Sequence, residues 1–297
     1  MSRVDAGAGD HVVTLGDGRV IGYREVGDPG GTPVLAFHGT PGSRFKNAGA
    51  HDSALANGIR LIALDRWGYG LSCAKFGATL ADYGRDIGQL ADQIGLGRFA
   101  VTGVSGGAPF AVAVAAVLKD RVSAVALVSP VGIIDGASGR AALSPFHEVC
   151  FRVAPRIPGL LAGSFLAYRA ILAVAPDFAM RIAVLKSARA DKAAISDERA
   201  RADMAATFAE GLEAGVAGPV TDMALFGRPW GIRFAEICAD VNIWIGLDDR
   251  NVPLSAVWAL HGALPTSICV KLAGAGHQWL AGHHDVVLGW IHERARH

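Results

Sequence analysis

The pattern Gly-x-Ser-x-Gly at residues 103–107 constrains the fold of this chain more than any other feature. An apolar run at 99–102 precedes it and a longer one at 108–118 follows it, which predicts a buried strand, a tight turn and a core helix. Such a turn holds its serine in a strained conformation, with the hydroxyl above the carboxyl edge of a parallel sheet. Gly103 and Gly107 leave room for the strand and the helix to approach closely. The alternative interpretation is an ordinary turn with an inert serine.

Short apolar runs and helical stretches alternate on both sides of this turn. The predicted strands are 12–15, 20–26, 34–37, 59–64, 99–102, 122–128, 241–245 and 268–272, and the predicted helices are 80–94, 108–118, 254–260 and 284–294. The first two strands form a β-hairpin across a glycine-containing turn. The others predict right-handed βαβ crossovers, and so an α/β fold with a mostly parallel, doubly wound sheet.

The alternation stops between residues 128 and 241. A structureless connection of that length is implausible in a compact domain. The intervening stretch is rich in Ala, Leu, Phe and Arg and is broken by prolines, which favours short helices. We therefore expect an inserted helical cap over 133–230, with a catalytic domain made of 11–132 and 231–297.

Composition excludes several classes of function. Lys and Arg number 28 and Asp and Glu number 27, so neither nucleic acid nor an anionic membrane is an expected partner. No stretch has the length and apolarity of an integral membrane segment. The first ten residues lack the apolar core of a signal peptide, and the four cysteines are scattered, so a cytoplasmic location is expected. A homodimer is one possible oligomeric state.

Residues able to carry out nucleophilic catalysis follow three of the predicted strands. A serine hydroxyl such as that of Ser105 needs an adjacent base, and histidine suits that role because its pKa lies near 6.5. His277 is the best candidate of ten histidines, because it lies in a glycine-rich loop between the last strand and the last helix. His283 and His284 fall at the start of that helix and look like surface residues. The alternative for His277 is a solvated loop side chain.

The carboxylate that would orient His277 has two adjacent candidates, Asp248 and Asp249. We prefer Asp249 and keep Asp248 as the alternative; Asp135 is a weaker candidate. Paired aspartates can also bind a metal, but no His or Cys accompanies these two at ligand spacing. No metal and no cofactor is therefore expected.

An oxyanion hole needs two amide groups directed at the developing negative charge. The backbone N–H of Gly106, directly after the serine, supplies one. Thr40, in the loop after the third strand, supplies the other. His38 belongs to the same loop; we expect a structural role for it and also keep it as a candidate for the substrate pocket.

Five motifs in this order resemble the α/β-hydrolase fold family. They are residues 38–43 (HGxPGS), 65–72 (DRPGYGxS, with Trp67 in place of the proline), 103–107 (the nucleophile elbow), 246–253 (GxxDxxVP) and 274–277 (GxGH). The resemblance covers about 12–131 and 238–297. It implies the order Ser, Asp, His for the catalytic triad, and its acid-loop spacing implies Asp249.

The resemblance also narrows the chemistry. Haloalkane dehalogenases and epoxide hydrolases of this family carry aspartate at the elbow, so Ser105 argues against both. Prolyl aminopeptidases share the oxyanion loop, but they need acidic cap residues, and Glu210 and Glu213 are expected on a solvated helix. Carboxylic-ester hydrolysis through an acyl-enzyme is the implied activity. The alternatives are an amidase or C–C hydrolase with the same triad, or a non-catalytic ligand-binding protein.

Apolar side chains of the cap are expected to select a small or medium apolar ester. The pocket candidates are Phe146, Phe151, Phe178 and Trp230, within a wider set that includes Phe165, Met180, Met204, Phe208 and Phe226. Most of the wider set is expected to pack cap helices together. The arginines of the cap have acidic residues nearby, so no anionic substrate is indicated.

Overall fold

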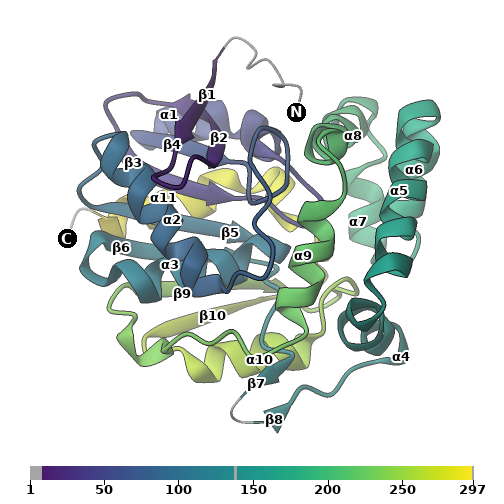
Figure 1. The fold of residues 1–297 in the computed structure, drawn as a ribbon. Coiled ribbons are helices and arrows are strands. Elements are labelled where there is room, and N and C mark those ends of the chain that lie inside the picture. The colour runs from purple at the N-terminus through teal and green to yellow at the C-terminus, as the bar shows by residue number, and fades with distance from the viewer. Residues whose placement is uncertain (1–8, 137–138, 296–297) are drawn as a thin grey trace.

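One eight-stranded sheet organises the part of the chain that the computed structural model describes, residues 9–136 and 139–295 (Figure 1). Its strand order is β1-β2-β4-β3-β5-β6-β9-β10. The bounds are β1 (Asp10–Thr14), β2 (Val20–Gly27), β3 (Thr32–Phe37), β4 (Ile59–Leu64), β5 (Phe99–Val104), β6 (Val122–Val128), β9 (Asp240–Gly246) and β10 (Ser267–Leu272). The hairpin β1–β2 is antiparallel, β2 runs antiparallel to β4, and the remaining pairs are parallel. The fold class predicted from the sequence is therefore confirmed.

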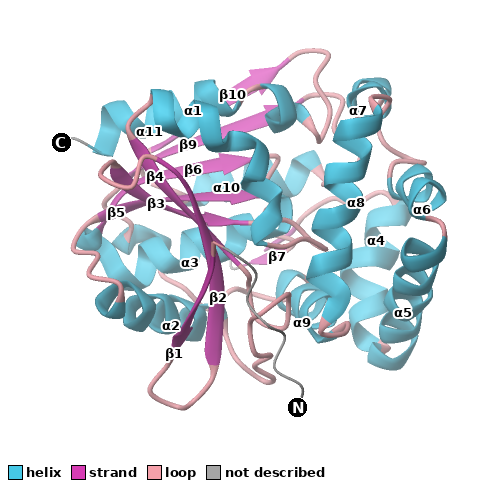
Figure 2. Cartoon of the chain, turned by 90° about the horizontal axis from the view of Figure 1, so that it is seen from above, coloured by secondary structure: helices cyan, strands magenta, loops and turns pink. Residues whose placement is uncertain are grey.

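Helices cover both faces of this sheet (Figure 2). Helices α2 (Leu80–Gln93), α3 (Ala108–Leu118) and α10 (Leu254–Ala263) pack on one face, and α1 (His51–Ala56) and α11 (His284–Ala295) pack on the other. Every residue of β5 and β6 is buried, because helices screen both of their faces from water. That burial explains why these strands read as continuous apolar runs.

The segment between β6 and β9 is helical, apart from the short ribbon β7 (Asp135–Gly136) and β8 (Gly139–Arg140). Its α-helices are α4 (Pro145–Glu148), α5 (Pro158–Val174), α6 (Pro176–Ala183), α7 (Arg189–Ala194), α8 (Glu198–Glu213) and α9 (Ala217–Phe226). They lie together on one side of the sheet, at the right of Figure 1. Leu172, Met180 and Leu212 belong to a small apolar core of their own there. We call residues 133–230 the cap.

Buried ion pairs join the cap to the sheet. Arg44 lies in η1 (Arg44–Ala50), a 3-10 helix that the sequence analysis did not predict. Its guanidinium is 2.7 Å from Asp65, which follows β4, and 2.5 Å from Glu210 of α8. A third carboxylate, Asp10, pairs with it at 2.7 Å. Glu210 is thus engaged by Arg44 and is not on a solvated face.

No single helix in residues 9–136 and 139–295 has the length and apolar character needed to cross a membrane. The helical stretches Pro145–Arg156 and Pro158–Val174 reach that length and composition only together, and they meet at a bend of 113°.

Candidate active site

Ser105 occupies the turn between β5 and α3 in a left-handed conformation, with φ of +52°. A non-glycine residue in that region is strained, and such strain gathers at functional sites. The turn is tight because its glycines admit no side chain: a Cβ on Gly103 would lie 2.8 Å from the Cα of Ala108, and one on Gly107 would overlap the carbonyl oxygen of Phe37. The predicted elbow geometry is present.

The loops after β9 and β10 bring Asp249 and His277 together. Nδ1 of His277 lies 2.8 Å from Oδ2 of Asp249, and both residues are buried. Because a carboxylate only accepts hydrogen bonds, Nδ1 carries the proton and Nε2 is left as a base. The other Asp249 oxygen accepts from the backbone N–H groups of Asn251 (2.8 Å) and Val252 (3.2 Å), which fixes the carboxylate.

The two weaker acid candidates lie elsewhere. Asp248 is exposed to solvent beside Asp249. Asp135 pairs with Arg140 and with Arg152, at 3.1 Å and 2.9 Å. Of the three carboxylates, Asp249 is the one that contacts the imidazole.

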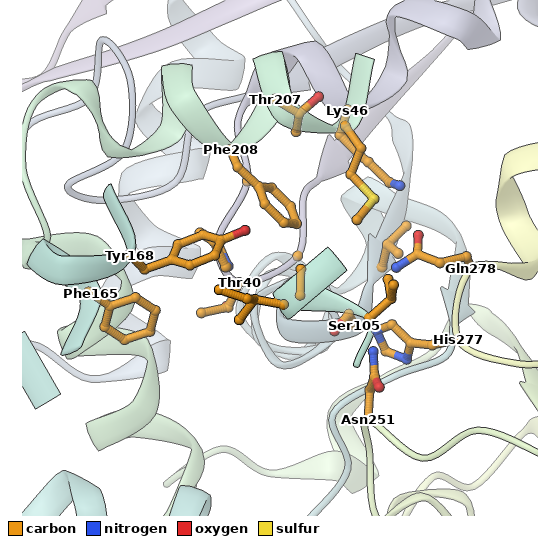
Figure 3. A pocket seen from close by; sticks show the side chains of 18 of the residues that line it. Thr40, Lys46, Ser105, Phe165, Tyr168, Thr207, Phe208, Asn251, His277 and Gln278 are labelled. Carbon is orange, nitrogen blue, oxygen red and sulfur yellow. The ribbon is translucent and has the colours of Figure 1, made fainter. Parts of the chain in front are cut away.

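Ser105 and His277 line one cavity and lie side by side in Figure 3. Their side chains are not hydrogen-bonded to each other in the structure. Contacts of this kind tighten when substrate binds.

The protonation of His277 is set by opposing effects. Burial has the largest single effect and lowers the pKa of the imidazole, but the charge and hydrogen bond of Asp249, together with the charge of Asp191, outweigh it, so that the pKa is raised above 6.5. Asp191 of the cap adds to the increase, and the positive charge of Lys46 opposes it. Three charged side chains, those of Asp249, Asp191 and Lys46, therefore influence the protonation of His277.

The loop after β3 packs directly against the serine. A Cβ on Gly39 would lie 3.3 Å from the Cβ of Ser105, and one on Gly106 would overlap the side chain of Thr40. Thr40 and Gly106, the two residues whose backbone amides are predicted to form the oxyanion hole, are therefore neighbours beside Ser105.

A buried carboxylate from the cap holds this loop. Asp222, on α9, accepts hydrogen bonds from the Thr40 hydroxyl (2.6 Å) and the Tyr69 hydroxyl (2.5 Å). Its other oxygen pairs with Arg66 at 2.6 Å, and Arg66 also donates to the carbonyl oxygens of His38 and Gly39 at 3.0 Å. No sequence motif marks Asp222 for this role, because only the docking of α9 brings it to the loop.

His38, a candidate for the substrate pocket, is not among the residues that line this cavity. Its ring is buried, with Nδ1 donating to the carbonyl oxygen of Gly39 (2.7 Å) and Nε2 accepting from the backbone N–H of Arg66 (3.1 Å). Burial, and secondly the nearby Arg66 charge, hold its pKa well below 6.5. A neutral His38 thus joins two loops, in agreement with the structural role expected for it.

The cavity has a volume of about 550 Å³ and is largely apolar. Of the four aromatic candidates, Phe146 lines it. The other three do not line this cavity: Phe151 and Trp230 pack in the main core, and Phe178 is 57% exposed. The cap residues that line it are Phe146, Ser164, Phe165, Tyr168, Ile182, Ala183, Val184, Met204, Thr207 and Phe208.

Asp191 is a second buried carboxylate from the cap that sequence analysis missed. It lies on α7, and its Oδ1 accepts a hydrogen bond of 2.7 Å from the backbone N–H of Gln278. A Cβ on Gly276 would overlap its carboxylate. The cap therefore contacts the loop of His277 as well as the loop after β3.

A metal site is not evident in residues 9–136 and 139–295, where no three His, Cys, Asp or Glu side chains are grouped as ligands. The groups around Ser105 suit proton transfer and the stabilisation of negative charge.

Comparisons with known proteins place this geometry in context. A family model described as the alpha/beta hydrolase fold matches residues 32–280. Haloalkane dehalogenase 2 of Mycobacterium tuberculosis is 36% identical over 99 residues, which are 33% of this chain and 34% of that protein. A component of the acetoin cleaving system of Cupriavidus necator, a dihydrolipoyllysine-residue acetyltransferase, is 31% identical over 52% of this chain and 44% of its own length. The chain thus spans less than half of the length of these curated relatives.

Solved structures are similar over the whole fold. An alpha/beta hydrolase fold protein from Nakamurella multipartita has a TM-score of 0.70 at 22% identity, covering 97% of this chain and 100% of its own. A thermophilic esterase from Thermogutta terrifontis has a TM-score of 0.67 at 21% identity, covering 97% and 98%. At these identities the likeness concerns the fold.

Proposed function

The chain belongs to the alpha/beta hydrolase fold family, and from this membership and the geometry around Ser105 we propose that it is a serine hydrolase that cleaves carboxylic esters. The observation that carries the proposal is one cavity lined by a serine in left-handed conformation and by a histidine that is hydrogen-bonded to a buried aspartate. That combination matches the requirements of nucleophilic acyl transfer.

The reaction proceeds in two stages. Nε2 of His277 takes the proton of the Ser105 hydroxyl as the oxygen attacks the ester carbonyl, and Asp249 stabilises the imidazolium that forms. The backbone N–H groups of Thr40 and Gly106 bind the negative oxygen of the tetrahedral intermediate. His277 then protonates the leaving alcohol. Water, activated by the same imidazole, hydrolyses the acyl-enzyme and releases the acid.

The lining of the cavity favours an ester over an N-terminal proline amide. Recognition of a substrate ammonium group needs a carboxylate, and none of the described lining residues is Asp or Glu. Glu210 is paired with Arg44, and Glu213 is exposed to solvent. The aromatic rings of Phe165 and Phe208 instead suit the apolar part of an ester.

A panel of substrates tests this proposal. Aryl esters of increasing acyl length, a prolyl amide and a vinylogous diketone are compared at equal concentration, with Ser105→Ala as the inactive variant. Ser196→Ala is the matched control, because Ser196 is exposed on the cap and donates to the carbonyl of Ala193. We expect turnover of the esters by the wild type and the control, and a loss of at least 10³-fold in Ser105→Ala.

Preference for the amide or the diketone would favour the alternative activities with the same triad. Binding without turnover of any substrate would favour a ligand-binding protein on this scaffold.

A further inference from the structure

Lys46 brings an unexpected charge into the catalytic cavity. It lies in η1, and its side chain lines the cavity together with Ser105, His277 and Gln278 (Figure 3). Among the described lining residues Lys46 is the one lysine or arginine, and none of them is Asp or Glu.

The ammonium group of Lys46 has no partner in the described part of the chain. Neither an ion pair within 4.0 Å nor a side-chain hydrogen bond is formed by it, although the residue is half-buried. Arg44, two residues earlier, shows the contrast, because three carboxylates surround its guanidinium. Burial lowers the pKa of Lys46, as expected for a cation that has lost water without gaining an anion.

Lys46 lines the same cavity as Ser105 and His277. Its charge lies close enough to His277 to oppose protonation of the imidazole. Lys46 also lines a neighbouring cavity of about 400 Å³, which contains Arg199, His284 and the acidic Asp203. The catalytic cavity contains no such acid among its described residues, so an anion placed there meets Lys46 without competition.

We propose that the substrate is an ester with an apolar body and a carboxylate, and that the carboxylate pairs with the Lys46 ammonium group while the ester carbonyl lies at Ser105. This inference rests on the proposed esterase function and names its substrate class. Pairing supplies the counter-charge that Lys46 lacks, and the side-chain amide of Gln278, which also lines the cavity, offers a further hydrogen-bond donor. The sequence predicted no anionic substrate, because the arginines of the cap have acidic residues nearby. The cation that lines the cavity is Lys46, which lies outside the cap.

Two pairs of esters test the proposal. Each pair consists of an anionic ester and a neutral ester of similar size and shape. Monoethyl adipate and its neutral amide, ethyl adipamate, place the carboxylate in the acyl half. The esters 4-acetoxybenzoate and 4-acetoxybenzamide place it in the leaving half. For each pair the ratio of kcat/KM for the anionic ester to that for the neutral ester is measured in the wild type and in variants.

We expect Lys46→Gln to lower this ratio by about 10- to 100-fold for at least one pair, with most of the change in KM. Lys46→Arg, which keeps the charge, should retain a higher ratio than Lys46→Gln. Lys192→Gln is the matched control, because it removes the same charge from the exposed face of α7. Thermal unfolding of each variant checks that the fold is intact.

An unchanged ratio in Lys46→Gln for both pairs would overturn the inference. Calorimetric titration of Ser105→Ala with monoethyl adipate separates this outcome from failure of the proposed function. If no ester is hydrolysed, the esterase proposal fails. If Ser105→Ala and the double variant Ser105→Ala/Lys46→Gln bind monoethyl adipate equally, the assignment of Lys46 fails.

Discussion

The hydrogen bonds of Asp222 lead to an expectation about both stability and rate. Asp222→Asn keeps the shape of the side chain but removes its charge, and so leaves the guanidinium of Arg66, which is fully buried, without its anionic partner. The same substitution alters the hydrogen bonds that Asp222 accepts from Thr40 and Tyr69. One change therefore perturbs both the attachment of α9 and the oxyanion loop.

The expected magnitude follows from burial. Breaking a buried ion pair by removing one charge costs about 3–5 kcal/mol, because the remaining charge stays out of water. The exposed pair between Asp177 and Arg201, 2.7 Å long, gives the comparison: its carboxylate is 74% exposed, so water already screens the two charges and Asp177→Asn should cost only a small fraction of that amount. Complete loss of one oxyanion donor lowers kcat by about 10²–10³-fold, so a displaced Thr40 amide should cost up to that amount.

Urea unfolding and ester hydrolysis measure the two effects. We expect Asp222→Asn to lower the free energy of unfolding by several times the change in Asp177→Asn, and to lower kcat more than it raises KM. Equal stability losses in the two variants would refute the argument from burial. A normal kcat in folded Asp222→Asn would refute the claim that the cap holds the oxyanion loop through this carboxylate.

The remaining predictions concern the acid, the base and the elbow. Asp249→Asn should lower kcat by about two to four orders of magnitude, whereas Asp248→Asn, a change at an exposed side chain, should have little effect; steady-state assays that gave the reverse would reassign the acid. Because catalysis needs the neutral imidazole and the pKa of His277 is raised, kcat/KM should increase with pH through a midpoint above 6.5. Asp191→Asn removes a group that raises this pKa, so the midpoint should move to lower pH; a shift to higher pH would contradict the assigned sign. In Gly106→Ala the added Cβ overlaps the hydroxyl of Thr40 and displaces the proposed oxyanion hole, so kcat should fall by at least about 10²-fold. Circular dichroism checks that this variant is folded.

The sheet and the elbow could be predicted from the sequence because local chemistry determines them. β5 and β6 are buried on both faces, so their sequences are continuously apolar. The turn around Ser105 requires glycines at fixed positions, since strand and helix backbones approach there. The short helix α1 was missed, because six residues show too little periodicity to mark a helix.

The cap side of the cavity could not be predicted, because it depends on which helix face meets the sheet. Phe146 and Phe178 are both partly exposed, at 40% and 57%, yet Phe146 lines the cavity and Phe178 does not. Asp191 and Asp222 look like ordinary helix-surface residues until α7 and α9 are docked. Lys46 lies in a helix that was not predicted, so its direction could not be inferred.

Covalent labelling tests the central claim most directly, which is that Ser105 acts as a nucleophile activated by His277 and Asp249. The folded protein is treated with a fluorophosphonate, and the modified peptide is identified by mass spectrometry. The mechanism requires one adduct on Ser105, no adduct in Ser105→Ala, and much slower labelling in His277→Ala. A folded wild-type protein that remains unlabelled, or one labelled equally fast without His277, would contradict it.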